Sequence, residues 1–243
     1  MKDQLNDLIS HTVQLGFIDT LKIVGSDKET AITANAEDRT VIISGKLKGP
    51  NAEFIGTFGM PNLNKLKTIL SFDDYDEHAT ISMTRQQRDG QDVPVAIHFE
   101  TKSKDFVNDY RLMSQAIVEE KVKVVKFAGA AWNVQFEPKI VNIQRLKKQA
   151  NANAESPTFV TKTDGTDLKI HFGDVSSHSA NFVFESAISG SLARAWAWPV
   201  KQFLSIMDLA GDKKIYISDQ GAMKITVDSG IADYEYLLPA QQV

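Results

Sequence analysis

The stretch PKIVNIQRLKKQANANA, residues 138–154, decides how the whole chain is interpreted. Its apolar residues recur at helical spacing and form one stripe, made of Ile140, Ile143, Leu146 and Ala150. At about 100° per residue, Arg145 and Lys148 point away from that stripe, and Lys139 and Lys147 flank it. No acidic residue occurs between Lys139 and Ala154. The pattern therefore predicts an amphipathic helix with a basic face, and a merely solvated helix surface is the alternative interpretation.

The composition makes this basic face a local feature. The chain has 243 residues, 42% of them hydrophobic, which is enough for one large domain or two smaller ones. Its formal net charge is −4, so any contact with a polyanion must come from a local patch. The absence of cysteine excludes disulfides and cysteine-bound zinc. The polar start predicts no signal peptide, and no apolar run approaches the length of a membrane span.

The first half of the chain reads as helix, strands, helix, strands. A helix is expected over about residues 3–15, where Gly16 can end it, and a second short helix begins at Pro61. Alternating runs predict strands at 20–25, 31–35, 40–47, 52–59, 79–85, 93–100 and 106–113. Residues 114–123 break this pattern and are interpreted as a linker, weakly helical or extended, that leads into 124–129.

The same order returns in the second half. A strand at 132–136 precedes the basic helix, and a fourth helix begins at Pro199. Further strands are expected at 158–162, 167–172, 180–187, 192–198, 214–218, 223–227 and 234–239. Trp196 and Trp198 fall on strand positions typical of a core, although Trp198 could also be a surface anchor.

The two halves are in register. Leu5 and Leu8 match Ile143 and Leu146 at an offset of about 138. In the second helix, Leu63, Leu66 and Ile69 match Val200, Phe203 and Ile206 at about 137. We therefore predict an α+β fold made of two repeated domains, each with two helices packed on antiparallel sheets. The expected domains are 1–113 and 126–243, joined by a connector at 114–125.

This repeat resembles the DNA polymerase sliding clamps of the proliferating cell nuclear antigen and phage processivity-factor type. The matching segments are Tyr110-Arg-Leu-Met113, Asn62–Leu70 and Ala232–Pro239, while the order of elements matches over nearly the whole chain. The resemblance implies a DNA clamp fold, three chains closed head to tail, and a non-enzymatic role in DNA replication. It also implies a divergent, viral type of clamp in the cytoplasm, which is the host cytoplasm for a phage protein.

A ring of three such chains fits around duplex DNA. Twelve helices spaced by ~10 Å give a circle about 38 Å across, and removing ~10 Å for side chains leaves a hole of roughly 28 Å. Duplex DNA is roughly 20 Å wide. The ring would hold DNA without reading its sequence, because phosphate contacts carry no base information. The candidate DNA contacts are Lys65, Lys67, Lys139, Arg145, Lys147, Lys148 and Lys201, with Lys2 and His11 as weaker candidates. Asp3 and Asp7 oppose such a role for the first helix.

The resemblance also implies partner surfaces. A pocket for a short peptide from the replicative polymerase or the clamp loader would be formed by Met113, Ile117, Val118, Tyr236, Leu238 and Pro239. In the alternative interpretation, Ile117 and Val118 only attach the linker to the sheet. The subunit contact would pair strand 106–112 of one chain with strand 180–186 of the next.

No catalytic or metal-binding pattern competes with this interpretation. The five histidines show no ligand spacing, and there is no phosphate loop, nucleophile elbow or zinc signature. No cofactor and no metal are therefore expected. The alternative function is a two-domain α+β enzyme or ligand-binding protein whose site the sequence does not reveal.

Overall fold

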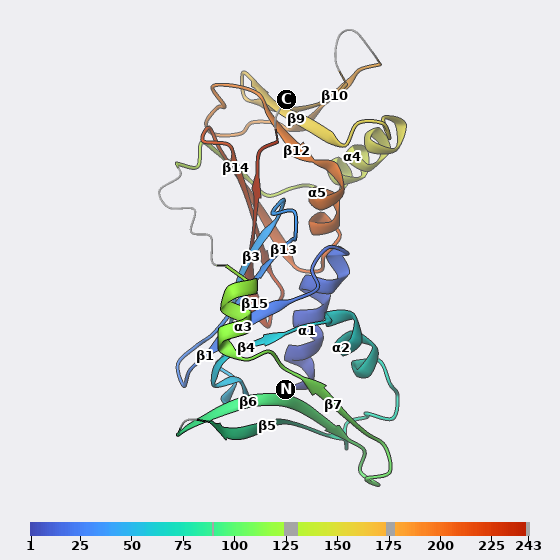
Figure 1. Cartoon of the computed structure of the whole chain (residues 1–243). Helices are drawn as coiled ribbons and strands as arrows, with labels where there is room; N and C mark the ends of the chain where they lie inside the picture. The colour runs from blue at the N-terminus through green and yellow to red at the C-terminus, as the bar shows by residue number, and fades with distance from the viewer. Residues whose placement is uncertain (89, 124–130, 174–177, 242–243) are drawn as a thin grey trace. The chain divides into compact units, whose positions relative to one another are not determined.

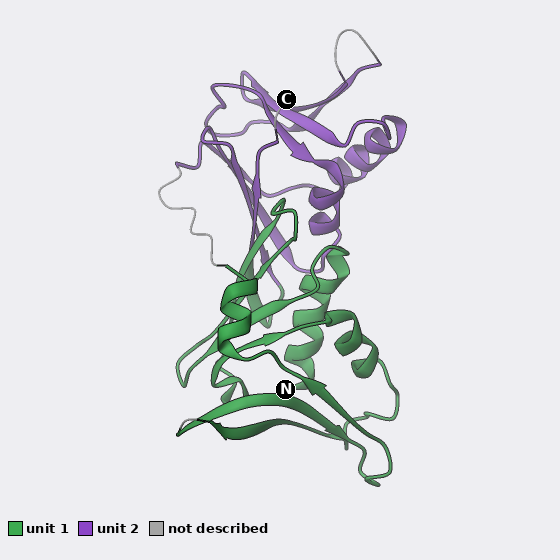
Figure 2. Ribbon diagram, in the orientation of Figure 1, with its two compact units in different colours: residues 1–125, 229–234 green, residues 126–228, 235–243 purple. Residues whose placement is uncertain are grey.

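The computed structural model describes residues 1–88, 90–123, 131–173 and 178–241 (Figure 1). The chain divides into two compact units, shown in different colours in Figure 2. Unit 1 comprises residues 1–125 and 229–234, and unit 2 comprises residues 126–228 and 235–243. The segment 124–129, which the expected linker leads into, and the end of the expected connector lie outside the described residues.

Unit 1 begins with a helix and carries two antiparallel sheets. Its helices are α1 (Lys2–Thr12), the 3-10 turns η1 (Val13–Leu15) and η2 (Ala52–Phe54), α2 (Leu63–Leu70) and α3 (Gln115–Lys121). Its strands are β1 (Leu21–Gly25), β2 (Thr30–Asn35), β3 (Ile42–Leu47), β4 (Gly56–Met60), β5 (Thr80–Arg88), β6 (Gln91–Glu100) and β7 (Val107–Arg111). The strands pair in the orders β4-β1-β2-β3 and β5-β6-β7.

The helices of unit 1 form where the sequence predicts them. Helix α2 follows Pro61 and buries Leu63, Leu66, Ile69 and Leu70, which are the residues expected to face inward. It lies beside α1, which buries Leu5 and Leu8 (Figure 1). Each fully buried leucine stabilises this layer by about 1.5–3 kcal/mol. Within the expected linker, Gln115–Lys121 is helical as α3 rather than extended.

Unit 2 repeats this plan. After β8 (Val134–Phe136) its helices are α4 (Ile140–Ala152) and α5 (Val200–Met207). Its further strands are β9 (Thr158–Asp164), β10 (Asp167–Phe172), β11 (Ala180–Glu185), β12 (Trp196–Pro199), β13 (Asp212–Ser218), β14 (Ala222–Asp228) and β15 (Ala232–Pro239). The order β12-β9-β10-β11 reproduces β4-β1-β2-β3 strand for strand. Three strands follow the second helix in both halves, so the α+β fold with two repeated domains is confirmed.

Strand β15 is divided between the two units. Its residues 232–234 belong to unit 1, and its residues 235–239 belong to unit 2. Within unit 2, β13 pairs with both β8 and β14 in antiparallel register. The first unit of the chain is therefore completed by residues near the end of the sequence.

Aromatic side chains fill the core of unit 2. The ring of Phe203 on α5 lies 5.0 Å from Phe159 and 6.3 Å from Phe184, measured between centroids. Trp198 is fully buried, and its indole Nε1 donates to Thr161 Oγ1 at 2.8 Å. Trp198 is thus a core residue, and the surface-anchor interpretation was wrong.

The basic helix α4 is turned relative to the predicted stripe. Leu146 is fully buried as expected, but Ile140 is 75% exposed. Asn142 is buried instead, and its side-chain Nδ2 donates to the backbone oxygen of Phe184. That carbonyl is free to accept because Phe184 is skipped in the register between β10 and β11. A polar side chain therefore takes an inward position that apolar spacing alone assigned to Ile140.

No helix in the described ranges is long and apolar enough to cross a membrane.

Candidate functional site

Helices α2, α4 and α5 share one electrostatic property. Their sequences, LNKLKTIL, IVNIQRLKKQANA and VKQFLSIM, contain six basic residues and no acidic residue. The chain as a whole carries 31 Asp and Glu against 27 Lys and Arg. These three helices therefore lack acidic residues, although acidic residues outnumber basic residues in the whole chain.

Helix α2 presents two lysines to solvent. Lys65 and Lys67 are exposed and alternate with the buried Leu63 and Leu66. Neither ammonium pairs with an acid in the described part of unit 1. Both charges therefore remain available to a ligand outside the chain.

Helix α4 presents a mixture of free and paired cations. Arg145 and Lys148 are exposed and have no ion pair to a described residue. Lys147 Nζ pairs with Asp208 Oδ1, just after α5, and Lys139 Nζ pairs with Glu185 Oε1 at the end of β11. The Lys147–Asp208 pair is about half exposed on both sides, so it stabilises the fold by only about 0–1 kcal/mol.

Helix α5 adds one cation to this set. Lys201 is exposed near the start of the helix, while Phe203, Ile206 and Met207 are buried. It has no acidic partner among the residues that the structure describes. Helices α4 and α5 pack against each other within unit 2, so Lys201 and the α4 cations belong to one helical layer.

The polar face of α1 is used inside unit 1, which corrects the expectation for this helix. Asp7 and His11 are 8% and 3% exposed, respectively. Tyr234 OH donates to Asp7 Oδ2 at 2.8 Å, and Lys2 Nζ donates to the backbone oxygen of Tyr75. Burial raises the pKa of Asp7, but hydrogen bonds from His11 and Tyr234 outweigh it and hold that pKa below its ordinary value.

As a result, α1 carries neither the expected anionic face nor the weaker cationic candidates. Lys2 and His11 have partners inside unit 1, and Asp7 is enclosed. The exposed stripe of this helix and of η1, which follows it, consists of Asp3, Asn6, Ser10 and Gln14. Three of these four side chains are neutral, so α1 neither attracts nor strongly repels phosphate.

The connector helix α3 is attached to β4 through one residue. Val118 is fully buried, and a Cβ placed on Gly59 would lie 2.6 Å from Val118 Cγ2. Gly59 and Met113 also exchange two backbone hydrogen bonds, of 3.1 and 2.8 Å. Ile117 is 55% exposed. Val118 therefore attaches the connector, as in the alternative interpretation, while Ile117 remains available to a partner.

The pocket residues expected near the end of the sequence, Tyr236, Leu238 and Pro239, lie in unit 2 and are mostly buried. Tyr236 and Leu238 are fully buried, and Pro239 is partly exposed. Buried side chains of this kind support β15 from within and are not surface contacts in this conformation. Of the six expected pocket residues, only Ile117 is fully on the surface, with Met113 and Pro239 partly so.

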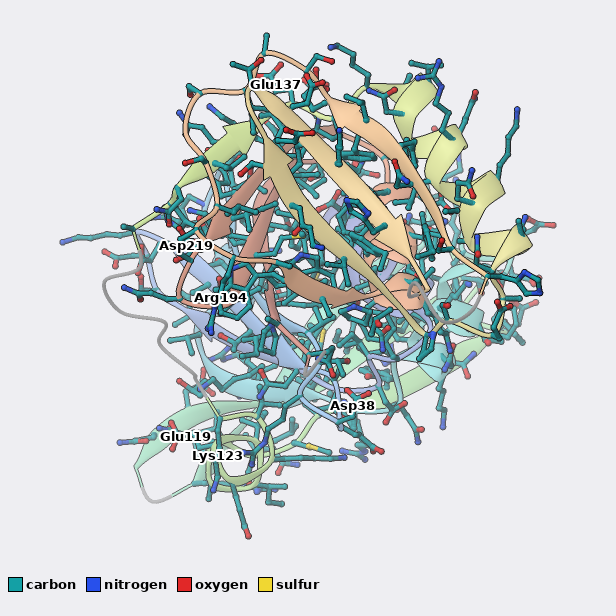
Figure 3. All side chains as sticks on the ribbon, turned by 90° about the horizontal axis from the view of Figure 1, so that it is seen from above. Asp38, Glu119, Lys123, Glu137, Arg194 and Asp219 are labelled. Atoms are coloured by element: carbon teal, nitrogen blue, oxygen red, sulfur yellow. The ribbon has the colours of Figure 1, made fainter. Side chains whose placement is uncertain are left out.

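A groove beside the end of α3 was not predicted. It has a volume of about 490 Å³, and its lining includes Thr20, Asn35, Arg39, Val122 and Lys123. Asn35 Nδ2 donates to the backbone oxygen of Lys123 at 2.9 Å, which ties the connector to the end of β2. Figure 3 shows Glu119 and Lys123 on this segment. The contact joins residues that are 88 positions apart, so a local sequence pattern cannot predict it.

Two buried side-chain oxygens of residues that line this groove have no hydrogen-bond partner within the described chain. They are Thr20 Oγ1 and Asn35 Oδ1. The amide of Asn35 cannot be turned around, because its nitrogen faces a carbonyl that only accepts. Both oxygens are buried, so each lacks a hydrogen-bond donor inside the described part of unit 1.

Two sheet edges are open in the separate units. β7 is an outer strand of β5-β6-β7, and β11 is an outer strand of β12-β9-β10-β11. The resemblance to sliding clamps implied a subunit contact through these two strands. In the described ranges, no three His, Cys, Asp or Glu side chains converge as metal ligands.

Comparison with known proteins places the fold. No protein-family model matches the chain, and no curated protein matches it in sequence. Among solved structures, it is similar to A. fulgidus PCNA bound to the C-terminal region of FEN-1, with a TM-score of 0.69, 11% identity, and coverage of 100% of this chain and 96% of that chain. For Thermococcus kodakaraensis PCNA the TM-score is 0.68 at 12% identity, with coverage of 99% of this chain and 97% of that chain. For the proliferating cellular nuclear antigen of Entamoeba histolytica the TM-score is 0.67 at 14% identity, with coverage of 99% of this chain and 94% of that chain. The chain thus has the fold of the PCNA sliding clamps over its full length.

Proposed function

From this sliding-clamp fold, we propose that the chain is a DNA sliding clamp. Three copies close head to tail into a ring around duplex DNA and tether the replicative polymerase, which makes synthesis processive. In this proposal the chain is a scaffold and not an enzyme. The likeness to clamps over 99–100% of the chain supports the architecture, although identity of 11–14% carries the fold alone.

The observation that carries the DNA role is the acid-free character of α2, α4 and α5. Lys65, Lys67, Arg145, Lys148 and Lys201 are exposed cations without an acidic partner in the described chain. In a protein of net charge −4, such a segregation favours a polyanion as the ligand of these helices. Duplex DNA is the polyanion that a clamp fold accommodates.

Sliding requires these contacts to be weak and exchangeable. Each lysine or arginine that meets a phosphate displaces counterions, and the gain is the same at every position along the duplex. The Lys147–Asp208 pair lowers the number of permanently free charges, because Lys147 must leave Asp208 before it can bind phosphate. A small number of mobile cations therefore holds the DNA central without fixing the ring to one site.

The partner surface is proposed on unit 1. A. fulgidus PCNA is bound to the C-terminal region of FEN-1 in its structure, which supports peptide docking on this fold. In the present chain, Ile117 offers an exposed apolar contact on α3, and the groove lined by Thr20 and Asn35 lies beside the end of that helix. A short peptide from the polymerase or the clamp loader would place an apolar anchor against Ile117.

A threading experiment tests encirclement directly. Linear duplex DNA is incubated with the protein, and both ends are then blocked with streptavidin before a salt wash. A ring that has threaded over an end is retained only on blocked DNA, whereas a surface binder is lost equally from blocked and open DNA. Cutting the blocked duplex in its middle should release the retained protein.

Two outcomes contradict the proposal. A mass of one chain at micromolar concentration in solution would favour the alternative of a two-domain enzyme or ligand-binding protein. A trimer whose retention does not depend on the DNA ends would keep the oligomer but remove encirclement.

A further inference from the structure

A second groove lies within unit 1, where η1, the turn between β2 and β3, and the start of α2 meet. Its volume is about 480 Å³, which is in the range of pockets that hold a ligand. The residues that line it are Val13, Gly16–Asp19, Ala36–Asp38 and Asn64. We call it the Phe17 groove. It shares no lining residue with the connector helix α3.

Backbone hydrogen bonds hold the walls of the Phe17 groove in place. Leu63 N donates to Asp19 O at 3.1 Å, which joins the start of α2 to the segment after η1. Arg39 N donates to Ala36 O at 3.0 Å and closes the turn between β2 and β3. The groove is therefore formed before any ligand arrives, and binding does not have to order these segments.

The inner part of the lining is apolar. Val13, Ile18 and Ala36 are at most 6% exposed, and Phe17 is partly exposed. The methylene groups of a long side chain pack on such a surface, and the phenyl ring offers its face to a cation. The inner lining therefore suits a side chain that is apolar along its stem.

The outer part of the lining is acidic. Asp19, Glu37 and Asp38 are exposed, and none of them forms an ion pair with a described residue. Figure 3 shows Asp38 on the turn between β2 and β3, where its Oδ1 accepts from Thr40 N at 3.0 Å and from Thr40 Oγ1 at 2.6 Å. No residue that lines the groove in the described chain is basic. These charges complement a cation and repel phosphate.

Arginine combines the properties that this lining requires. Its planar guanidinium presents five donors, pairs with carboxylates and stacks on aromatic rings, while lysine carries a compact ammonium that does not stack in this way. Negative charge alone does not make the site. The turn 73–77 carries four acidic residues, and none of them lines the Phe17 groove.

We propose that the Phe17 groove is a docking site for an arginine side chain of a partner protein. The stem packs against Phe17, and the guanidinium pairs with the carboxylates of Asp19, Glu37 and Asp38. The inference goes beyond the proposed DNA role and does not depend on the ring, because every lining residue belongs to unit 1. Duplex DNA does not compete for this site, because the same carboxylates repel its phosphates.

A titration with a single amino-acid analogue tests the site. N-acetyl-arginine amide is added to the isotope-labelled full chain, and backbone amide shifts are followed by NMR. We expect saturable shifts, with millimolar affinity, that are confined to residues 16–19, 36–38 and their neighbours. N-acetyl-citrulline amide, which has nearly the same shape but no charge, should cause none of them. Tighter binding of N-acetyl-lysine amide would overturn the assignment to arginine.

Variants test which residues hold the analogue. Asp19→Asn/Glu37→Gln should weaken its binding by about fivefold or more, because two exposed carboxylates are lost. Asp73→Asn/Asp74→Asn removes the same charge from another exposed turn of unit 1 and should leave the affinity unchanged. An equal loss in both variants would mean general attraction to an acidic protein and would overturn the site.

Phe17→Leu tests the ring, because it keeps an apolar side chain but removes the aromatic face. It should weaken binding of the arginine analogue by about threefold. An unchanged affinity would overturn the stacking contact. Thermal unfolding of each variant separates a lost site from a lost fold.

This inference and the proposed function fail separately. A chain that is retained on blocked DNA but shows no saturable shift with the arginine analogue would keep the clamp and overturn the docking site. A chain that binds the analogue in the Phe17 groove but does not encircle DNA would keep the docking site and overturn the clamp.

Discussion

The imidazole of His11 stacks on the phenol ring of Tyr234, with ring centroids 4.7 Å apart and planes 8° from parallel. The same tyrosine, on β15, donates to Asp7, which lies one helical turn before His11. The Asp7 carboxylate therefore contacts both His11 of α1 and Tyr234 of β15. His11 Nδ1 adds a contact of 2.9 Å to the backbone oxygen of Asp7. This buried trio fastens α1 to the segment 229–234 of unit 1.

Removing the tyrosine hydroxyl should loosen this attachment. Tyr234→Phe keeps the ring stacked on His11 but leaves Asp7 Oδ2 without its donor. We expect the free energy of unfolding at neutral pH to fall by about 1–2 kcal/mol. Urea unfolding at one fixed protein concentration measures the change. An unchanged midpoint would mean that water replaces the hydroxyl without loss.

The trio should also contribute to acid sensitivity. The pKa of Asp7 in the folded chain lies below its ordinary value of 3.8, so the ionised form stabilises the fold. This contribution is present above pH 3.8 and is lost as the pH falls through the lowered folded pKa. Asp7→Asn should therefore be less stable than wild type at pH 7, and the difference should shrink below pH 3.8. Unfolding curves at pH 7, 4 and 3 test this, and a constant difference would contradict it.

Gly59 should tolerate no side chain. A Cβ at this position meets Val118 at 2.6 Å and Met113 at 3.1 Å, so Gly59→Ala must displace α3. We expect a loss of about 1–3 kcal/mol in stability and faster proteolysis within residues 114–123. Gly49→Ala is the matched control, because nothing lies within 4 Å of its added Cβ. Equal proteolysis of the two variants would argue against Val118 as the attachment of the connector.

The helix cations should set the salt dependence of DNA retention. Changing Arg145, Lys147 and Lys148 together to alanine should reduce clamp-dependent synthesis and leave the fold intact. The slope of log affinity against log salt should fall by about two units, since the free Arg145 and Lys148 each contribute about 0.9. Asp208→Asn, which releases Lys147, should act in the opposite direction. Unchanged processivity in the triple variant would remove these residues from DNA contact.

Substitutions of Ile117 and Leu238 should distinguish a residue that contacts a partner from a residue that supports the fold. Ile117→Glu places a charge on a side chain that is 55% exposed, so it should abolish polymerase stimulation while changing stability by less than about 0.5 kcal/mol. Leu238→Glu places a charge at a fully buried position. It should therefore lower the free energy of unfolding several-fold more than Ile117→Glu does. Stimulation that survives Ile117→Glu in a folded trimer would move the partner surface elsewhere.

Much of the fold could be predicted because its signals are local. Helices α2 and α5 follow prolines and bury residues at regular helical spacing, and the two halves repeat at a nearly constant offset. The exposed cations on these helices could be predicted for the same reason, because the position of the apolar face determines which residues face the solvent.

The parts that sequence reasoning missed depend on partners far away in the chain. Asn142 is buried because it serves a carbonyl 42 residues later, and Asp7 is buried because of a tyrosine 227 residues later. The groove beside α3 likewise needs the contact between Asn35 and Lys123. Periodicity assigns polar residues to the outside, so it fails wherever a distant partner satisfies them inside.

The late position of Tyr234 has a consequence for biosynthesis. A ribosome that has delivered all of residues 1–228 has still not released the strand segment against which Asp7 and His11 close. The amino-terminal half must therefore remain incomplete until residues 229–234 have been translated. Nascent chains stalled before residue 229 should accordingly be bound by chaperones, whereas released chains that contain residues 229–234 should not.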